Sequence, residues 1–571
     1  MKKLNKLCAC LLCAVMAFAF AGCNSDEEQN NDMYNGTINI FVPFDTYATN
    51  ALTYVKNAYR RLHPQTTINI TNGGDSYEQA VEGIILAPEE SDIDIVQVNV
   101  VSQYYGTDKI VDFTPYLRRR NPYGTPNANG QYPVWSTMLS EEARRVEENG
   151  YTVPNLSFES NYVAVYYSKQ LFETNGWEEP KNWAEMTELL RSAKEKGYTA
   201  PLGLNYDKSG IGGIMSGMVL QMYMDQYFRD IIDEVHSQDG DYSYIDSIDS
   251  VWEYDPSNPA VDARSGYTYN MSRLINAYFN TDEYNPKSAR FADMMTNFKE
   301  LLSYSSETYN SSTIRNFFHN GVLTELTEDN KFGKAETCVL FVNRLDYLSD
   351  FQSAIGSVLK ANGEISTDMI PTDKLGDYLG WFALPAMPDN ASVEGGAPAS
   401  QTVRTYGGPN HHPMGIINRN NKKRTDLAVD FMQFWYSPQG MEEYYSYYSE
   451  RGIVCPLKIL VNDFALPENI VIDTRVTDFG ICVDNPYFEM GMGYNNTILS
   501  SEGGTVRDKF LQTLRDYLSP AESKGWNAFG SQLFGHVRSG FAKWADYKYL
   551  KVQTPDNITD YYTITPFKSK Q

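Results

Sequence analysis

Polar and aromatic side chains follow two of the strands that we predict near the N-terminus. Asp45 and Tyr47 come after the segment TINIFV, and Asn99 and Tyr104 lie at or after the end of DIDIVQVNV. In open α/β sheets, ligands collect at the carboxyl ends of the strands. A carboxylate, a carboxamide and two phenol rings at that edge offer hydrogen bonds and flat apolar faces. This edge is therefore a predicted binding site.

A second polar group stands in front of a strand that looks buried. Asn155, Ser157 and Glu159 precede an alternating, tyrosine-rich strand predicted over 162–167. Hydrogen-bonding groups cost free energy when they are buried without partners. Their position directly before this strand therefore indicates a function for these polar groups, which the neighbouring segments help to identify.

Asn343 and Arg344 end another buried strand, AETCVLFVNR, and are also candidate site residues. No motif indicates a metal or a cofactor. His411 and His412 are adjacent, so they are badly placed to share one ion, and no cysteine or carboxylate cluster supports them. The acidic run DGDYSYIDSID lacks the spacing of an EF-hand loop, although a structural Ca²⁺ there stays an open alternative.

The elements around these residues alternate between strand and helix. Strands predicted over 37–42, 66–71 and 92–100 are separated by helical periodicity, which indicates a parallel sheet flanked by helices. Ser76 and Gln79 are spaced as a capping box for the second helix. Further along, Asn182 is the predicted cap of a helix whose buried stripe is Met186, Leu189, Leu190 and Ala193.

The chain has 571 residues, which is too long for one compact core, so we expect two or more lobes. Apolar residues make up 42% and charged residues 21%, as in soluble globular proteins. The formal net charge of −24 repels nucleic acid, so nucleic-acid binding is not expected.

The N-terminus has the features of an export signal. A positive start precedes an apolar run over 7–20, which is too short to span a membrane. Ala21-Gly22-Cys23 resembles the lipobox of bacterial lipoproteins, which implies a signal peptide over 1–22 and a lipid on Cys23. An ordinary secretory signal is the alternative. Residues 23–36 are polar and acidic, as a disordered tether would be. Cys338, Cys455 and Cys482 lie further on, and whether two of them pair stays open.

Several segments, in this order, resemble a known family. They are TINIFVPFD with NAYRRLHPQTTINI, DIDIVQVNV with KIVDFTPYL, VAVYYSKQLFETNGWEEPKNWAEMTELL, FGKAETCVLFVNR, and the long run from YGGPNHHPMGIINR to RGIVCP. The chain resembles the extracellular solute-binding proteins of bacterial ABC importers, in the carbohydrate-binding family 1 that includes the maltose-binding proteins. The resemblance spans roughly residues 37–460. The chain departs from the family in residues 236–285, in its long tail after 460, and at Asn343, where the family often has glycine.

The resemblance implies an α/β fold of two lobes, the type II periplasmic-binding-protein-like fold, with a ligand cleft at the hinge. Each lobe would be a mainly parallel sheet flanked by helices. We expect lobe 1 to comprise 37–156 plus 342–406, and lobe 2 to comprise 157–341 plus 407–571. Residues 154–161 would be a hinge crossing, with further crossings near 341 and 407.

The resemblance also implies roles for the candidate residues. A sugar presents hydroxyls and C–H patches, which suit planar polar groups and aromatic faces. Each role has a plain alternative: a helix cap for Asp45, a hinge salt bridge for Glu159, a structural ion pair for Arg344, and core packing for the aromatics. Hydroxyl partners would be Asp45, Asn99, Glu159, Asn343 and Arg344, and aromatic faces would be Tyr47, Tyr104, Trp381 and Tyr406.

The implied function is that of a monomeric receptor, anchored by its lipid on the outer face of the bacterial cytoplasmic membrane. It would capture a sugar or oligosaccharide and deliver it to an ABC permease, without being an enzyme. A surface glycoside hydrolase is an alternative, which needs two carboxylates such as Asp45 and Glu159 across the cleft. A glycan-binding lipoprotein outside any importer is a third alternative, but the strand-helix alternation argues against its helical type.

Overall fold

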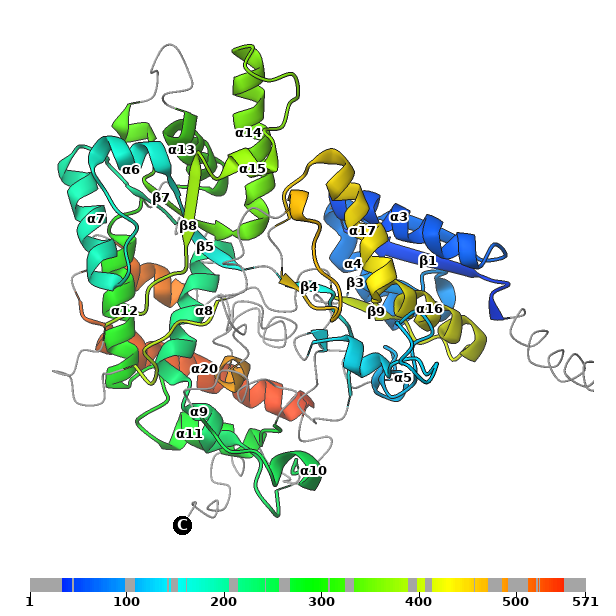
Figure 1. Cartoon of the computed structure of the whole chain (residues 1–571). Helices are drawn as coiled ribbons and strands as arrows, with labels where there is room; N and C mark the ends of the chain where they lie inside the picture. The colour runs from blue at the N-terminus through cyan, green and yellow to red at the C-terminus, as the bar shows by residue number, and fades with distance from the viewer. Residues whose placement is uncertain are drawn as a thin grey trace, which may run out of the picture.

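The structure of the full chain is a computed structural model. The residues that it describes are 33–43, 46–97, 108–140, 143–144, 152–160, 162–204, 214–241, 243–255, 267–306, 309–323, 333–388, 398–405, 413–455, 458–470, 485–490, 512–519, 522 and 524–548. They form two α/β bodies, which Figure 1 shows side by side with β4 between them.

The first body is built on a four-stranded sheet in the order β2-β1-β3-β9. β1 lies parallel to β2 and β3, whereas β9 is antiparallel to β3. Alternation along β1 sends Ile38 and Ile40 into the core, each at most 1% exposed. The elements are β1 (Thr37–Val42), α3 (Thr46–Leu62), β2 (Thr67–Asn72), α4 (Tyr77–Leu86), β3 (Ile95–Gln97), α5 (Thr114–Leu117), β9 (Met414–Ile416), α16 (Lys422–Trp435) and α17 (Pro438–Arg451).

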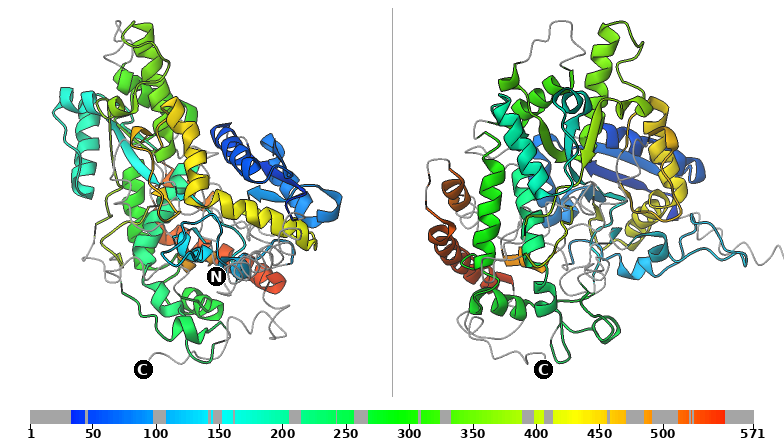
Figure 2. Two further views of the ribbon diagram at one scale, coloured as in Figure 1. Left: turned by 45° about the vertical axis from the view of Figure 1, so that its right-hand side comes forward. Right: turned by 60° about the vertical axis from the view of Figure 1, so that its left-hand side comes forward.

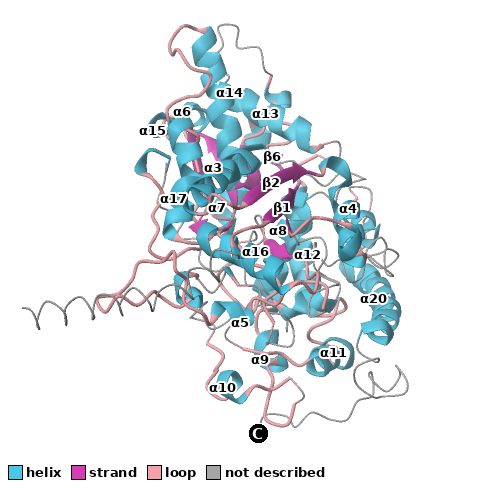
Figure 3. Ribbon diagram, turned by 90° about the vertical axis from the view of Figure 1, so that its right-hand side faces the viewer, coloured by secondary structure: helices cyan, strands magenta, loops and turns pink. Residues whose placement is uncertain are grey.

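Helices cover both faces of this sheet. α3, α16 and α17 share one core with Ile38, Ile40 and Ile95, and α4 packs with Val96 on the other face. Figure 3 shows α3 and α17 beside each other over the strands. Asp430 of α16 accepts hydrogen bonds from the hydroxyls of Tyr59 and Tyr123, both at 2.6 Å. Burial raises the pKa of Asp430, although these two donors lower it.

The second body has a sheet in the order β6-β7-β5-β8. β7 and β8 flank β5 antiparallel, and β6 lies parallel to β7. Its strands and first helices are β5 (Val163–Ser168), α6 (Lys169–Asn175), α7 (Trp183–Glu195), β6 (Leu202–Gly203), α8 (Ile214–Phe228), α9 (Ile231–Val235) and α10 (Asp246–Asp249). They are followed by α11 (Met271–Asn280), α12 (Ala289–Leu302), α13 (Ser311–Leu323), β7 (Leu340–Arg344), α14 (Leu348–Ala361), α15 (Thr372–Leu375), β8 (Leu379–Phe382) and α20 (Trp526–Lys548).

Two cores sandwich this second sheet. Val163, Val165 and Val342 face a large core with α7, α8, α11, α12 and α20. Ala164, Tyr166 and Trp381 face a smaller core with α13, α14 and α15. Figure 2 shows α13 and α14 at the opposite end of this body from α9 to α11.

The expected fold class is confirmed, but 342–406 and the β9 to α17 part of 407–571 lie in the opposite bodies from those expected. Residues 342–406, which we expected in lobe 1, contain β8 and most of β7, and both strands pair with β5. Residues 407–571, which we expected in lobe 2, contain β9, α16 and α17, which pack with β1 and β3. β7 is thus a strand of the second sheet and not a crossing near 341. The second sheet is also mostly antiparallel, not mainly parallel.

Of the two predicted helix caps, one is confirmed and one was wrong. Asn182 caps α7 by accepting from the Glu185 N–H at 2.9 Å, and the predicted stripe of α7 is buried. The capping box at Ser76 was wrong, because the Ser76 side chain makes no cap hydrogen bond. The predicted signal peptide, Cys23 and residues 24–32 of the tether lie outside the described residues.

None of the helices in the described part of the chain is both long and apolar enough to cross a membrane.

Candidate functional site

The two bodies meet at a short antiparallel sheet. β4 (Glu159–Ser160) pairs with β10 (Lys458–Ile459), with Glu159 opposite Ile459. In Figure 1 β4 lies between the bodies. We call this region, with its flanking residues 155–163 and 405, the junction.

The N-terminal half of the junction is bonded to the first body. The N–H and C=O of Leu156 exchange hydrogen bonds with Met414 of β9 at 3.0 and 2.8 Å, and the Tyr436 hydroxyl donates to the same carbonyl at 2.8 Å. Leu460 donates its N–H to the Phe158 carbonyl at 2.8 Å. The segment is therefore fixed by backbone bonds rather than by side chains alone.

The C-terminal half enters the second body beside another connection. The Val163 N–H donates to Thr405 Oγ1 at 3.0 Å, and that hydroxyl contacts the Val163 carbonyl at 3.2 Å. Thr405 is thus bonded to the second sheet, and Met414 is paired in the first, so these two residues belong to different bodies. The predicted crossing at 154–161 agrees with these contacts, whereas the crossing predicted near 407 lies outside the described residues.

The carboxyl edge of the first sheet reaches the junction. Gln97, the last residue of β3, is opposite Met414, which bonds to Leu156. β1 and β3 are parallel, so both end at this edge. Asp45, Asn99 and Tyr104 lie outside the described residues, and for Tyr47, in the first turn of α3, only the backbone is described. They come shortly after strands that end here.

Glu159 is buried in the junction, with 1% of its surface exposed. The Tyr445 hydroxyl on α17 donates to its Oε2 atom. Burial raises the pKa of Tyr445 far above its ordinary value, and the Glu159 carboxylate raises it further. The carboxylate therefore has a phenol partner that the sequence did not indicate, because α17 lies almost three hundred residues away.

Asn343 and Arg344 lie on the second body's side of the junction, since Arg344 is opposite Val163. Asn343 is 7% exposed, and its Oδ1 accepts from the Arg344 N–H at 2.8 Å. The Arg344 guanidinium is paired with Asp346 at 2.8 Å and stays partly exposed. The structure thus brings Asn343 and Arg344 to the same region as Glu159.

Trp381 does not join them. It lies on β8 opposite Tyr166, is 3% exposed and packs in the core beneath α13 and α14. Its large apolar ring is used for packing, the alternative that the sequence left open. Tyr406 lies outside the described residues, one position beyond Thr405.

A buried ion cluster anchors the connection that ends at Thr405. Arg229 and Arg404 both bind the carboxylate of Asp225, and all three are nearly inaccessible. Burial alone would raise the pKa of Asp225, but the two guanidiniums hold that pKa well below its usual range. The sequence analysis missed this cluster. The i,i+4 spacing of Asp225 and Arg229 could have indicated their ion pair, but nothing local indicated Arg404.

A second contact between the bodies lies at the end of α17. Gln352 of α14 is fully buried; its Oε1 accepts from the Val454 N–H at 2.8 Å and its Nε2 donates to the Gly452 carbonyl. Gly452 ends α17 with a φ of 61°. No local sequence pattern predicts the contacts of Gln352, because a glutamine on a helix is usually expected at the surface.

Comparisons with known proteins agree with this architecture. Residues 45–269 match the family model described as bacterial extracellular solute-binding protein. No curated protein matches the chain in sequence.

Solved structures match over most of the chain. A chitin oligosaccharide binding protein has a TM-score of 0.52 at 12% identity, covering 89% of this chain and 99% of its own. The cyclic alpha-maltosyl-1,6-maltose binding protein from Arthrobacter globiformis has a TM-score of 0.51 at 11% identity, covering 88% and 98%. A probable secreted solute-binding lipoprotein from Streptomyces coelicolor has a TM-score of 0.50 at 12% identity, covering 88% and 98%.

These findings define the class of protein. The fold is the type II periplasmic-binding-protein-like fold of solute-binding proteins. The predicted resemblance is confirmed: residues 45–269 match the family model described as bacterial extracellular solute-binding protein, and solved binding proteins share the fold of the chain.

Proposed function

We propose that this protein is the substrate-binding protein of an ABC importer, which holds a sugar or oligosaccharide between its two bodies and delivers it to the permease. The observation that carries the proposal is the junction. There the carboxyl edge of the first sheet, the buried Glu159 and the end of β7 meet along backbone connections that join two separately cored bodies.

Such a receptor needs no catalytic group. The ligand stabilises a closed arrangement by binding it more tightly than the open one, and closure bends the few residues that connect the bodies. β4, β10 and the connection beside Thr405 are short and lie next to one another, as a hinge requires.

We propose ligand roles for the candidate residues by their positions. Asp45, Asn99, Glu159, Asn343 and Arg344 would bind hydroxyls, and Tyr47, Tyr104 and Tyr406 would offer rings. Trp381 is the weakest member, because almost none of its surface is accessible. Two similar structures are named for oligosaccharides, a chitin oligosaccharide and a cyclic maltosyl-maltose, which supports a ligand of this class.

We propose that the chain acts outside the cell, anchored through a lipid on Cys23, as a monomer tethered to the outer face of the cytoplasmic membrane. The lipobox-like run before Cys23 supports the anchor, and one similar structure is named as a secreted solute-binding lipoprotein. Mass spectrometry of the membrane-extracted protein would show an N-terminal diacylated cysteine. An unmodified N-terminus beginning at another residue would contradict the anchor.

The experiment that tests the function is a thermal-shift screen of the exported domain against mono- and oligosaccharides, with chromatography of the same wells. We expect one group of glycans to raise the melting temperature without any released product. Released sugar would favour the hydrolase, and a complete absence of shifts across glycans would contradict sugar binding.

A further inference from the structure

Two segments of the first body carry positive charge, in contrast to the chain as a whole. The chain has 72 acidic and 48 basic residues. Residues 116–123, at the end of α5, hold three consecutive arginines and no acid, and residues 418–426, which lead into α16, hold four basic residues and one acid. Five of these basic side chains are exposed, and we call them the basic face: Arg118, Arg119, Arg120, Lys422 and Lys423.

The two segments of the basic face lie side by side. The Arg119 guanidinium lies over the Tyr116 ring, 4.5 Å from the ring centroid. Burial raises the pKa of Tyr116, whereas the charges of Arg119 and Lys422 lower it, so both cations lie near this ring. Asn121 fixes the arrangement, because its Nδ2 donates to the Gln433 carbonyl of α16 at 2.8 Å. Figure 1 shows α5 beside α16 on one side of the first body.

The charges of the basic face are not neutralised by ion pairs. None of its three arginines pairs with a carboxylate in the described part of the chain. Lys422 pairs with Asp426, but 80% of the lysine side chain stays exposed, and exposed ion pairs contribute little free energy. Arg419 and Arg424, by contrast, pair with the buried Asp94, so they do not belong to the basic face.

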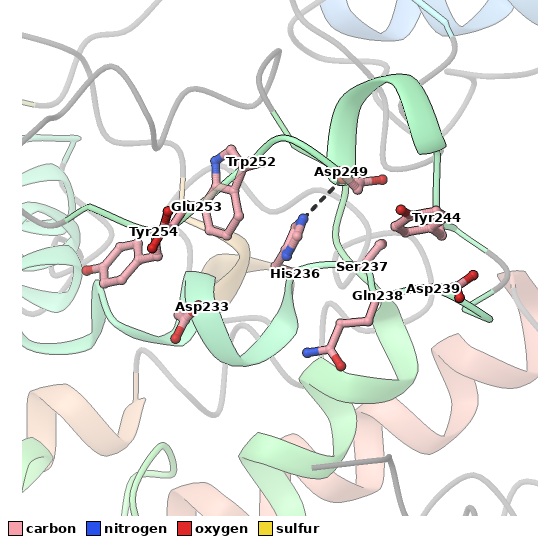
Figure 4. Close-up of a pocket in the computed structure, with 10 residues that line it drawn as sticks. All are labelled: Asp233, His236, Ser237, Gln238, Asp239, Tyr244, Asp249, Trp252, Glu253 and Tyr254. Atoms are coloured by element: carbon pink, nitrogen blue, oxygen red, sulfur yellow. Dashed lines mark ion pairs between the residues drawn. The ribbon is translucent and has the colours of Figure 1, made fainter. Parts of the chain in front are cut away.

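Acidic side chains gather in other parts of the molecule. A pocket between α9 and α10 of the second body, shown in Figure 4, is lined by four carboxylates and by no lysine or arginine. One of these carboxylates, that of Asp249, is ion-paired with His236 at 3.3 Å. The basic face is therefore a local exception on a chain whose formal net charge is −24. Because salt screens exposed charges beyond about 8–10 Å, a partner at this face interacts mainly with the nearby cations.

The predicted tether joins the first body beside the basic face. Tyr34 stacks on His63 with 3.7 Å between the ring centroids, and its carbonyl accepts from Thr66 Oγ1 at 2.7 Å. His63 Nε2 in turn contacts the hydroxyl of Tyr123 at 2.8 Å. Tyr123 ends the arginine segment, three residues after Arg120. The segment that leads from Cys23 therefore meets the folded protein next to its concentrated positive charge.

Exposed apolar side chains lie at the same place. Leu62 and Tyr132 are among the large apolar residues that the structure shows exposed, at 47% and 41%. Leu62 directly precedes His63, and the Tyr132 carbonyl accepts a hydrogen bond from the Arg120 guanidinium. Aromatic rings beside cationic groups suit the boundary between water and a lipid membrane, where tyrosine is enriched.

We propose that the basic face binds the anionic headgroups of a phospholipid membrane and holds the first body against it. Guanidinium and ammonium groups donate charge-assisted hydrogen bonds to phosphate oxygens. Each lysine or arginine near such a surface strengthens binding about fivefold. Tyr132 and Leu62 contact the lipid interface beside these cations.

The position of the basic face relative to the membrane rests on the lipid anchor proposed above for Cys23. Cys23 and Tyr34 are 11 residues apart, a separation that an extended chain spans with at most about 40 Å. A connection this short holds the basic face at roughly millimolar effective concentration relative to the lipid. Weak attraction by five cations is then enough to orient the protein.

The test is co-sedimentation of the whole exported protein, prepared without its lipid, with vesicles at roughly millimolar lipid. Vesicles of phosphatidylcholine alone are compared with vesicles of equal parts phosphatidylcholine and phosphatidylglycerol. We expect binding to the anionic vesicles only, and release at about 1 M salt, where the Debye length falls to about 3 Å. No binding to the anionic vesicles, equal binding to both kinds, or binding that resists salt overturns the proposal. Because this protein carries no lipid, the result does not depend on the anchor.

Two variants on separate elements locate the binding. Arg118→Gln combined with Arg119→Gln and Arg120→Gln should weaken binding to the anionic vesicles at least about tenfold. Lys422→Gln combined with Lys423→Gln, on α16, should weaken it at least about fivefold. If the arginine variant does not fold, the lysine variant still tests the proposal. Unchanged binding in the folded variants overturns it.

A control variant separates the basic face from the net charge. Arg191→Gln, Lys194→Gln and Lys196→Gln remove three exposed positive charges at the end of α7, in the second body. This change in net charge equals that of the arginine variant, but it leaves the basic face intact, so binding to the anionic vesicles should be unchanged. An equal loss in the control would mean that net charge alone governs the binding, which overturns the proposal.

A readout at the junction separates the basic face from the proposed receptor function. In the arginine and lysine variants, the glycan that raises the melting temperature of the wild type should raise it equally. Lost vesicle binding with an unchanged glycan shift supports a separate membrane-binding surface. A lost glycan shift in correctly folded variants would mean that these cations belong to the glycan site, which overturns the proposal.

Discussion

Glu159 is buried, charged and placed between the two bodies. It can bind the ligand or stabilise the fold, and two conservative substitutions distinguish these roles. Glu159→Gln keeps the shape and an acceptor for the Tyr445 hydroxyl, but removes the charge. If the carboxylate binds sugar hydroxyls, we expect glycan affinity to fall about tenfold or more, since hydrogen bonds to charged groups contribute about 1.5–3 kcal/mol. Calorimetry with the best glycan measures this change.

Tyr445→Phe is the matched control for the structural role. It removes only the hydroxyl that donates to Glu159, so we expect a loss of about 1–3 kcal/mol in the free energy of urea unfolding. If both variants lose stability and neither loses glycan affinity, Glu159 is a structural residue and leaves the proposed site.

The Asp225 cluster gives a stability prediction with a defined pH dependence. Asp225→Asn leaves Arg229 and Arg404 buried without their carboxylate, which should cost about 3–5 kcal/mol in urea unfolding at pH 7. Asp368→Asn, which removes an exposed partner of Lys360, should cost less than about 0.5 kcal/mol. Equal effects of the two substitutions would contradict the stabilising role of the cluster.

The pH profile follows from the lowered pKa of Asp225. A carboxyl group whose pKa is lower in the folded state stabilises the protein fully above its unfolded pKa, about 3.9. That contribution is lost as the pH falls through the folded pKa. The difference between wild type and Asp225→Asn should therefore stay constant from neutral pH down to about pH 5 and shrink only below about pH 4. A difference that shrinks already between pH 7 and 5 would contradict the lowered pKa.

At the scale of elements, two glycines should respond oppositely to the same substitution. Gly452 ends α17 at a φ of 61°, and Gly83 lies inside α4; an added Cβ atom would meet nothing within 4 Å at either position. Gly452→Ala should therefore destabilise by about 1 kcal/mol through backbone strain alone. Gly83→Ala should stabilise by about 0.5–1 kcal/mol through helix propensity. Thermal and urea unfolding of the two variants measure both signs, and a common sign would contradict the conformational argument.

How far the sequence predicted the elements depends on how local their causes are. β1, β2 and α7 were predicted because β-branched alternation, a helical stripe and the Asn182 cap act within a few residues. The sequence did not predict which sheet β7 and β9 belong to. β7 pairs with β5 and β9 pairs with β3, and these partners lie far away in the chain. The candidate site shows the same limit: Glu159, Asn343 and Arg344 were predicted from their positions beside strands, whereas the contacts of Tyr445, Thr405 and Gln352 depend on the three-dimensional structure.

At the scale of the whole molecule, two cores joined by short connections predict a change of shape on binding. The bodies have separate hydrophobic cores, and the described contacts between them centre on β4, β10, Thr405 and Gln352. A saturating glycan should therefore decrease the radius of gyration in small-angle X-ray scattering, because each body stays rigid while the junction bends. A sugar that gives no thermal shift is the control for solvent contrast. Glu159→Gln at the same glycan concentration should show a smaller decrease, since less protein is occupied. An unchanged radius at proven saturation would mean that the bodies are already closed without ligand or do not close at all, and it would contradict capture by hinge bending.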